Sequence, residues 1–266
     1  MPATIAITRS GPVATVTLRR PKVHNALNPA MIAELTEAFC EEGARAETRV
    51  VLLTAEGKSF CAGADLNWMR EAAAYTPEQN AADALSLACM LQSVYECPKP
   101  VIARVQGSAF GGGVGLVAAC DLAVAVEPAT FCFSEAKLGL VPAIIAPFVL
   151  QRMTAGEARR YMLTAAPVRA DEARRIGLVT EVSESAEAAD ATIAQWVADI
   201  LRNGPEALAT CKRLLTSVGG PPTSDLLRRC AAVLADVRAG AEGREGVQAF
   251  LEKRAPRWIA GDDGVP

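Results

Sequence analysis

The chain is poor in histidine, in long apolar runs and in excess positive charge, and each shortage excludes a class of function. It has 1 histidine, so catalysis of the Ser-His-Asp or Cys-His type would have to use His24, and a zinc site would need other ligands. Its 27 basic and 30 acidic side chains leave a net charge of −3, which argues against a large nucleic-acid interface. We interpret His24, in a polar connection, as a loop residue that touches ligand or solvent.

Paired cysteines and membrane segments are missing as well. No stretch reaches the roughly 20 apolar residues that span a bilayer, and no signal-like pattern follows Met1. The 8 cysteines include no C-x-x-C pair and lie mostly in apolar surroundings. We predict that they are buried and reduced, without disulfides. The expected protein is therefore cytoplasmic and makes no contact with a membrane or with nucleic acid.

The order of elements predicts an α/β region followed by a helical one. Two β-branched runs around Ser10-Gly11-Pro12 indicate a hairpin, and Asn28-Pro29 is expected to begin a helix that continues to about residue 46. Thr76-Pro77 is predicted to begin a second helix. Short apolar runs at 49–54, 100–105 and 122–126 indicate buried parallel strands. After residue 139 the pattern is helical, with one extended segment at 178–182 and a loose tail at 260–266.

The most informative segment is the glycine-rich run at 104–121, read together with Ser134-Glu135. It leaves a strand, passes three consecutive glycines, Gly111 to Gly113, and enters a helix. A backbone without side chains can approach a ligand and direct its N–H groups at it, aided by the positive end of the helix. A carboxylate about 20 residues later could supply acid–base chemistry. The alternative interpretation is a tight packing turn between strand and helix.

Five segments in order carry a resemblance to a known family. They are 20–27 (RPKVHNAL), 58–66 (KSFCAGADL), 107–121, 133–142 (FSEAKLGLVP) and 170–179 (ADEARRIGLV). With them the chain resembles the crotonases, the enoyl-coenzyme A (CoA) hydratase/isomerase superfamily, from about residue 4 to about residue 255. The resemblance implies an α/β fold, the crotonase (ClpP-like) spiral of ββα units with a helical C-terminal region.

The resemblance also implies a site for an acyl-CoA thioester. Crotonases hold the thioester oxygen between two backbone N–H groups, and the matching positions are Ala64 and Gly112. The acid–base residue of the later motif matches Glu135. The positions implied for binding CoA and the acyl group are Lys22, Val23, His24, Ala26, Ala62, Asp65, Leu66, Gly111, Ser134 and Leu140.

The chain departs from a typical hydratase at one catalytic position. The glutamate that usually follows the glycine turn is replaced by Gly115. Two carboxylates let one group take a proton from water while the other delivers a proton to carbon. With Glu135 alone, either that residue does both jobs in turn, or the enzyme is a double-bond isomerase, or the chain binds acyl-CoA without turning it over.

A second departure points to a subgroup. Bulky apolar residues occupy 143–150, where ordinary hydratases continue with glycines, and they should fill or reshape the wall beside the acyl group. This block and the segment 61–70 resemble bacterial methylglutaconyl-CoA hydratases of leucine breakdown and isohexenylglutaconyl-CoA hydratases. A glutaconyl group ends in a carboxylate, for which Arg70 is a candidate partner or simply an exposed helix residue.

The resemblance implies an assembly and a division of the chain. Family members form trimers and dimers of trimers, so we expect a homohexamer, with a spiral core at 1–200 and a helical trimerisation region at 201–266. No metal or redox cofactor is implied, because coenzyme A arrives as part of the substrate.

Overall fold

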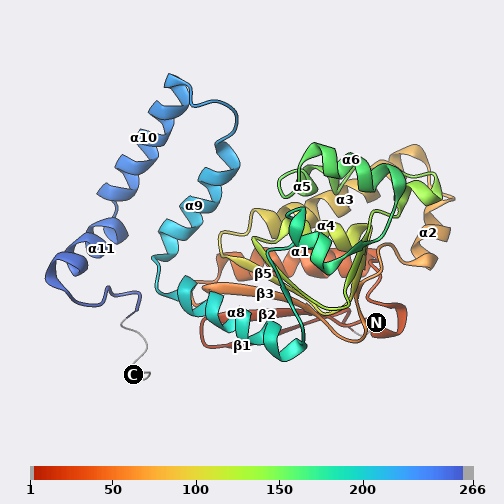
Figure 1. Cartoon of the computed structure of the whole chain (residues 1–266), viewed down its shortest axis with the longest axis horizontal. Coiled ribbons are helices and arrows are strands. Elements are labelled where there is room, and N and C mark those ends of the chain that lie inside the picture. The colour runs from red at the N-terminus through yellow and green to blue at the C-terminus, as the bar shows by residue number, and fades with distance from the viewer. Residues whose placement is uncertain (1–2, 260–266) are drawn as a thin grey trace. The chain divides into compact units, whose positions relative to one another are not determined.

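The computed structural model describes residues 3–259, and the predicted tail at 260–266 lies outside them. The chain forms two compact units that divide between Ala194 and Gln195, within helix α8 (Ala186–Leu201). Figure 1 shows the elements of each unit. Across residues 3–259, no helix combines the length and the apolar character needed to cross a membrane. The predicted boundary at residue 200 and the trimerisation role of the second part stay predictions.

The first unit contains a six-stranded sheet in the order β1-β2-β3-β5-β7-β10. Its strands are β1 (Ile5–Ser10), β2 (Val13–Leu18), β3 (Val50–Ala55), β5 (Val101–Val105), β7 (Leu122–Val126) and β10 (Glu181–Ser183). β1 and β2 form the predicted antiparallel hairpin, and every other pair in this sheet is parallel. Parallel pairs need long crossovers, which the helices between the strands provide.

A second sheet of four short strands accompanies the first in the order β4-β6-β8-β9. They are β4 (Ser59–Cys61), β6 (Ser108–Phe110), β8 (Thr130–Cys132) and β9 (Val168–Arg169). β4, β6 and β8 each follow a strand of the large sheet and pair in parallel with one another. Successive pairs β3–β4, β5–β6 and β7–β8 therefore add one strand to each sheet, which confirms the predicted spiral of strand–strand–helix units.

Helices of the first unit begin where the capping residues predict. Asn28 accepts a hydrogen bond from the N–H of Met31 at the start of α1, and Thr76 and Gln79 form a capping box at the start of α3. α1, α3 and α4 cover one face of the large sheet (Figure 1). The helices are α1 (Pro29–Ala44), α2 (Leu66–Ala72), α3 (Pro77–Tyr95), α4 (Gly112–Ala119), α5 (Ala146–Val149), α6 (Ala155–Thr164) and α7 (Ala170–Arg175), with 3-10 helices η1 (Pro21–Val23) and η2 (Glu135–Leu138).

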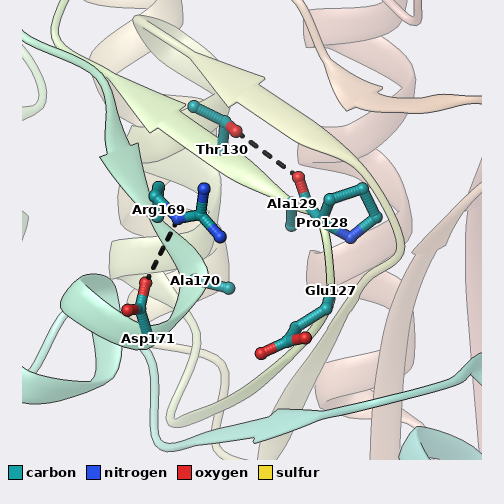
Figure 2. Close-up of a pocket in the computed structure, with 7 residues that line it drawn as sticks. All are labelled: Glu127, Pro128, Ala129, Thr130, Arg169, Ala170 and Asp171. Atoms are coloured by element: carbon teal, nitrogen blue, oxygen red, sulfur yellow. Dashed lines mark hydrogen bonds and ion pairs between the residues drawn. The ribbon is translucent and has the colours of Figure 1, made fainter.

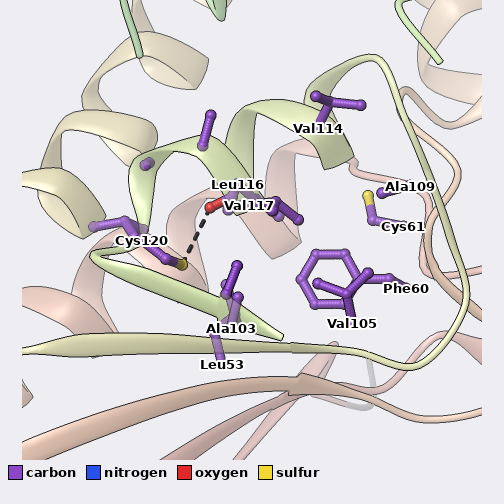
Figure 3. Close-up of a cluster of buried hydrophobic side chains, with 14 of the residues drawn as sticks. Leu53, Phe60, Cys61, Ala103, Val105, Ala109, Val114, Leu116, Val117 and Cys120 are labelled. Atoms are coloured by element: carbon purple, nitrogen blue, oxygen red, sulfur yellow. Dashed lines mark hydrogen bonds between the residues drawn. The ribbon is translucent and has the colours of Figure 1, made fainter. Parts of the chain in front are cut away.

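Helix α4 runs through the main hydrophobic core. Every residue from Gly113 to Ala119 is buried, and only Gly112 at its first position is half-exposed. Val114, Leu116 and Val117 pack among side chains from both sheets, including Phe60 and Val105 (Figure 3). An apolar helix of this kind needs no amphipathic pattern, because protein surrounds it on all sides.

The second unit is formed by helices alone among the described residues. They are the end of α8, then α9 (Pro205–Ser217), α10 (Ser224–Ala239) and α11 (Ala241–Glu252). α9 and α10 bury none of their residues in the single chain. Their exposed apolar side chains include Leu215, Leu227 and Leu234, with Phe250 and Leu251 on α11.

Two expectations from the sequence are corrected. The segment predicted to be extended at 178–182 becomes a strand only at Glu181, where β10 (Glu181–Ser183) begins, and residues 178–180 form a bend after Gly177, whose φ is 87°. Of the cysteines predicted to be buried, four are buried, but Cys40, Cys89 and Cys211 lie exposed on α1, α3 and α9. Apolar neighbours in sequence do not bury a residue on the outer side of an amphipathic helix.

Candidate active site

The loop after β2 is held by one buried asparagine. Asn25 is fully buried and has a left-handed φ of 54°, a conformation that asparagine tolerates better than most residues. Its side chain accepts from the N–H of Arg20 at 2.8 Å and donates to the carbonyls of Glu56 and Ser59 at 2.8 and 2.9 Å. These bonds satisfy its amide and fix the loop that precedes α1.

Ala64 presents an exposed backbone N–H beside this loop. Leu27 donates to the carbonyl of Gly63 at 2.7 Å and accepts from the N–H of Asp65 at 2.8 Å, so it bonds the residues on either side of Ala64. In extended backbone, neighbouring N–H groups point in opposite directions, and the N–H of Ala64 therefore points away from Leu27. No described group accepts a hydrogen bond from it.

Gly112 presents the second free N–H, at the first position of α4. The N–H groups of a helix's first turn have no partner within the helix, and no described residue accepts from that of Gly112. A Cβ on Gly63 would lie 3.0 Å from the carbonyl oxygen of Phe110 and 3.9 Å from the Cα of Gly111. The backbones that precede Ala64 and Gly112 are thus in contact, and the pairing of their N–H groups around one ligand oxygen stays a prediction.

Glu135 places its carboxylate next to this turn. Oε1 would lie 3.3 Å from a Cβ on Gly111, whose φ of 49° and missing side chain leave room for it. Oε2 is buried and has no hydrogen-bond partner within residues 3–259. Burial raises the pKa of Glu135 above the ordinary glutamate value, because the charged form loses its water. A carboxylate of this kind suits proton transfer to a bound ligand.

Gly115, one turn further along α4, faces protein instead of an open site. A Cβ at this position would lie 2.4 Å from Cγ2 of Ile145 and 3.1 Å from Cδ1 of Leu91. Both of those side chains are buried. Ile145 of the apolar block at 143–150 therefore occupies the volume where a side chain at residue 115 would begin, and the effect of the block on an acyl group stays a prediction.

Asp65 is buried and serves the architecture of the loop. Its side chain accepts from the N–H of Asn67 at 2.8 Å, which caps α2, and from the Arg20 guanidinium at 2.7 Å. Burial opposes ionisation of Asp65, but these hydrogen bonds outweigh that effect and hold the pKa of its carboxyl below its usual range. The ion pair with Arg20 thus joins the segment 61–66 to the loop after β2.

The remaining predicted binding residues surround these groups. Ala62 donates its N–H to the carbonyl of His24 at 3.0 Å, and Leu140 donates to the carbonyl of Glu135 at 3.1 Å. Lys22, Val23 and His24 are exposed on and after η1, whereas Ala26 is buried. Leu66 and Leu140 are exposed apolar residues. These two hydrogen bonds join Ala62 to the loop after β2 and Leu140 to Glu135.

Helix α2 carries Arg70, the candidate partner for an acyl carboxylate, together with Trp68 and Met69, and Tyr75 follows the helix. Trp68 is buried, and its Nε1 donates to Asp83 of α3 at 3.0 Å. Met69 and Tyr75 are half-buried. Arg70 is exposed and donates to the side chain of Asn67 at 2.8 Å, so it forms part of the helix surface in this structure.

Two other titratable groups, Cys61 and Asp121, are unsuited to chemistry. Burial raises the pKa of Cys61 to about 12, so its thiol stays protonated and is a poor nucleophile. Asp121 accepts from the backbone N–H of Val101 at 2.7 Å, which is a structural role between two neighbouring strands. In contrast to Asp65 and Asp121, Glu135 lies next to the glycine turn and has a carboxylate oxygen without a partner within residues 3–259.

A separate hollow lies near β8 and β9 and contains none of the predicted site residues (Figure 2). Its volume is about 140 Å³. It is lined by Glu127, Pro128, Ala129, Thr130, Arg169, Ala170 and Asp171. Arg169 is already engaged with Asp171 at 3.8 Å, and the hollow is small for a drug-sized or larger ligand.

Sequence reasoning missed the residues that position the site. Arg20 and Asn25 lie in the segment 20–27, but the sequence alone did not predict that their side chains hold this loop in place. The signal for Asn25 was weak, since an asparagine in a left-handed turn is common, while its burial depends on distant backbone carbonyls. Leu27, whose Cδ1 would lie 2.9 Å from a Cβ on Gly112, was not identified as the residue that links the two N–H donors.

Known proteins resemble this chain in both sequence and structure. The profile of the family described as enoyl-CoA hydratase/isomerase matches residues 8–261. The crystal structure of an enoyl-CoA hydratase from Shewanella pealeana superposes with a TM-score of 0.93 at 40% identity, covering 96% of both chains. The enoyl-CoA hydratase ACTT6 of Alternaria alternata is 35% identical over 88% of this chain and 77% of its own. A carnitinyl-CoA dehydratase of Salmonella typhi is 33% identical, covering 97% of this chain and 99% of its own.

Proposed function

The chain belongs to the enoyl-CoA hydratase/isomerase family, and we propose that it adds water across the double bond of a 2-enoyl-CoA thioester. The observation that carries the proposal is the unpartnered carboxylate of Glu135 beside a glycine turn whose first helical N–H is free. Such a site has a base and a hydrogen-bond donor for developing negative charge within one small region.

The thioester oxygen would accept hydrogen bonds from the N–H groups of Ala64 and Gly112. Charge develops on this oxygen when the bound thioester becomes an enolate, and fixed donors stabilise it without reorganisation. Gly112 also lies at the N-terminus of α4, where the helix dipole favours negative charge. Small residues at both positions let the carbonyl group approach the backbone.

Glu135 would act first as base and then as acid. Its carboxylate takes one proton from a water molecule as the oxygen of that water forms a bond to C3. The enolate is then protonated at C2 by the same carboxyl group, so one whole water is added and Glu135 regains its charge. The raised pKa of Glu135 helps the first step, because a carboxylate with a higher pKa is a stronger base.

The adenine and phosphate end of the substrate would lie along the loop after β2. Exposed Lys22 and His24 can meet phosphate groups, while Val23, Ala26, Ala62 and Leu66 offer apolar contacts. Asp65 contributes indirectly, because its ion pair with Arg20 fixes this loop. Gly111, Ser134 and Leu140 would line the approach to the reacting carbons.

A branched, glutaconyl-like acyl group fits the apolar block at 143–150. Ile145 and Leu91 make the surroundings of Gly115 apolar. Apolar surroundings favour the hydrocarbon part of an acyl group and disfavour a second acidic side chain. The terminal carboxylate of such an acyl group would need a cation, and exposed Arg70 on α2 is available for it.

Double-bond isomerisation is the second candidate. It is favoured because Ile145 and Leu91 leave no space for a second carboxylate at residue 115. One carboxylate is enough to remove a proton from C2 and return it at C4 of the dienolate. An acyl-CoA binding protein without catalysis is the third, which the retained Glu135 and both free N–H groups oppose.

Mass-resolved turnover by the purified protein distinguishes these functions. Crotonyl-CoA, 3-methylglutaconyl-CoA and 3-hexenoyl-CoA would each be incubated with it. A product one water heavier than its substrate is expected, with 3-methylglutaconyl-CoA preferred. A product of unchanged mass with a moved double bond would overturn hydration in favour of isomerisation. Tight binding of all three thioesters without any product would leave a binding protein.

A further inference from the structure

Because Gly115 replaces the second glutamate of a typical hydratase, another group must help Glu135 to hold the attacking water. Ile145 lies 2.4 Å from the Cβ position of residue 115, so α4 has no space for a second polar side chain there. A water aligned only by Glu135 could rotate about a single hydrogen bond. A second polar partner must therefore come from the residues next to Glu135 if the water is to be oriented.

Ser134 is the polar residue in that position. Its Oγ would lie 3.8 Å from a Cβ on Gly111, and Oε1 of Glu135 would lie 3.3 Å from the same point. Both oxygens thus border the space that the absent side chain of Gly111 leaves open. Two groups around one such space can share a single water, which bonds its partners at about 2.7–2.8 Å.

The fold does not use the Ser134 hydroxyl. Ser134 precedes η2 as its N-terminal capping residue, where a serine would commonly accept from a backbone N–H, but its side chain makes no such bond. No other hydrogen bond joins this hydroxyl to a residue in the range 3–259. A half-buried hydroxyl without a structural partner next to an unpartnered carboxylate indicates a site for a small polar molecule.

We propose that Ser134 orients the attacking water together with Glu135, in the place of a second carboxylate; this inference rests on the hydration proposed above. One hydrogen of the water is donated to Glu135 and the other to Oγ of Ser134, which directs an oxygen lone pair at C3. Glu135 takes its proton as the C–O bond forms and returns it at C2. Ser134 gains and loses no proton, so it is a water-positioning residue.

The test separates water addition from proton transfer at C2. Hydration of crotonyl-CoA and 3-methylglutaconyl-CoA would be measured for the unaltered enzyme, Ser134→Ala and Ser134→Thr. Exchange of the C2 hydrogens of butyryl-CoA with deuterium oxide would be followed by mass in the same proteins, because this exchange needs Glu135 and the two N–H donors but no added water. Ser86→Ala, an exposed change on α3, is the matched control.

We expect Ser134→Ala to lower the kcat of hydration about 10- to 100-fold with KM little changed, as the loss of one hydrogen bond in a transition state does. Its exchange rate at C2 should stay near that of the unaltered enzyme. Ser134→Thr, which keeps the hydroxyl, should retain most of the hydration. Glu135→Gln should lose both hydration and exchange.

Three results would overturn the inference in different ways. Equal hydration by Ser134→Ala and the unaltered enzyme would remove the role of Ser134 and leave the proposed function intact. A parallel fall in hydration and exchange would show that Ser134 acts on Glu135 and not on water. If the unaltered enzyme exchanges C2 hydrogens but adds water to neither thioester, the proposed hydration fails and the role of Ser134 fails with it.

Discussion

Two positions one turn apart on α4 have opposite environments. At its start, Gly112 is half-exposed with a free N–H, and the missing side chain of the adjoining Gly111 leaves space that the Glu135 carboxylate borders. At Gly115 the corresponding space is filled by Ile145 and Leu91. The first region leaves a polar group unsatisfied, and the second completes an apolar core. The same residue type thus makes room for a ligand in one place and for the protein itself in the other.

The difference has an energetic side. A buried carboxylate oxygen without a partner destabilises the fold, since its hydration is lost and no hydrogen bond replaces it. Burial of Ile145 and Leu91 stabilises the fold by about 25 cal/mol for each Å² of apolar surface removed from water. Substitutions at the first region should therefore change catalysis with little loss of stability, and those at the second should do the reverse.

Removing the charge of Glu135 should have the largest effect. We expect Glu135→Gln to lower kcat by about 10²–10⁴-fold, the range typical of a lost acid–base group. Steady-state hydration of the preferred thioester measures it. Glu127→Gln, an exposed glutamate in the separate hollow of Figure 2, is the matched control and should be unchanged. Activity of Glu135→Gln within about threefold of the unaltered enzyme would contradict the catalytic role of Glu135 beside the glycine turn.

Removing one N–H donor should have the next largest effect. Proline is tolerated at the first position of a helix, so Gly112→Pro removes the N–H while the helix can still form. We expect a loss of about 10²–10³-fold in kcat, as for one oxyanion donor. Ala241→Pro makes the same change at the first position of α11 and should leave turnover intact.

A thermal melt is needed alongside the kinetics of Gly112→Pro. The new ring approaches Cδ1 of Leu27, which would lie 2.9 Å from a Cβ at this position, although the end of a leucine side chain can move. If Gly112→Pro melts like the unaltered protein and still turns over at full rate, the free N–H of Gly112 is not an oxyanion donor.

Substitutions at Gly115 and Ile145 should lower the free energy of unfolding. Gly115→Ala places a Cβ 2.4 Å from Ile145 and should cost about 1–3 kcal/mol of unfolding free energy. Ile145→Ala alone should cost about 2–5 kcal/mol through the cavity it leaves. The double variant should lose less than the sum of both, because the new methyl group occupies part of that cavity. Chemical denaturation of the four proteins completes the cycle.

Gly113→Ala is the control for that cycle. Its Cβ would lie 2.4 Å from the backbone carbonyl oxygen of Cys61, which cannot be trimmed by a substitution. Combining Gly113→Ala with Ile145→Ala should therefore give additive losses. Additive losses for the Gly115 and Ile145 pair would contradict the direct contact between these two side-chain positions.

The sequence predicted those features of the comparison that local patterns encode. The helix starts at Asn28 and Thr76 were predictable because their capping bonds lie within the following turn. The strands β4, β6 and β8 were missed, since three residues are too few to show a period of two. The resemblance to crotonases supplied the spiral that these strands complete.

Contacts between distant segments were beyond local patterns. Gly115 and Ile145 are 30 positions apart in sequence, and Arg20 and Asp65 are separated by 45. The apolar block at 143–150 predicted that a wall would be filled, but not that Ile145 would meet Gly115. The free hydroxyl of Ser134 is likewise visible only once Gly111 and Glu135 are placed beside it.

The smallest expected effect is a pH-dependent difference in melting temperature between the unaltered protein and Glu135→Gln. The pKa of Glu135 is raised in the folded state by burial, so folding favours its protonated form. The stability that comes from protonated Glu135 is fully present below the unfolded glutamate pKa of about 4.3. It is lost as the pH rises through the higher pKa of the folded state.

Glutamine resembles the protonated acid at every pH, so its variant should not lose stability over that interval. We expect Glu135→Gln to melt with the unaltered protein near pH 4 and above it near pH 7, with the gap opening between these values. Differential scanning calorimetry of the two proteins in matched buffers measures the gap. A Glu135→Gln variant that melts at a lower temperature at pH 7 would mean that the carboxylate stabilises the fold. The conclusion that Glu135, unlike Ile145 and Leu91, is retained at a cost in stability would then be wrong.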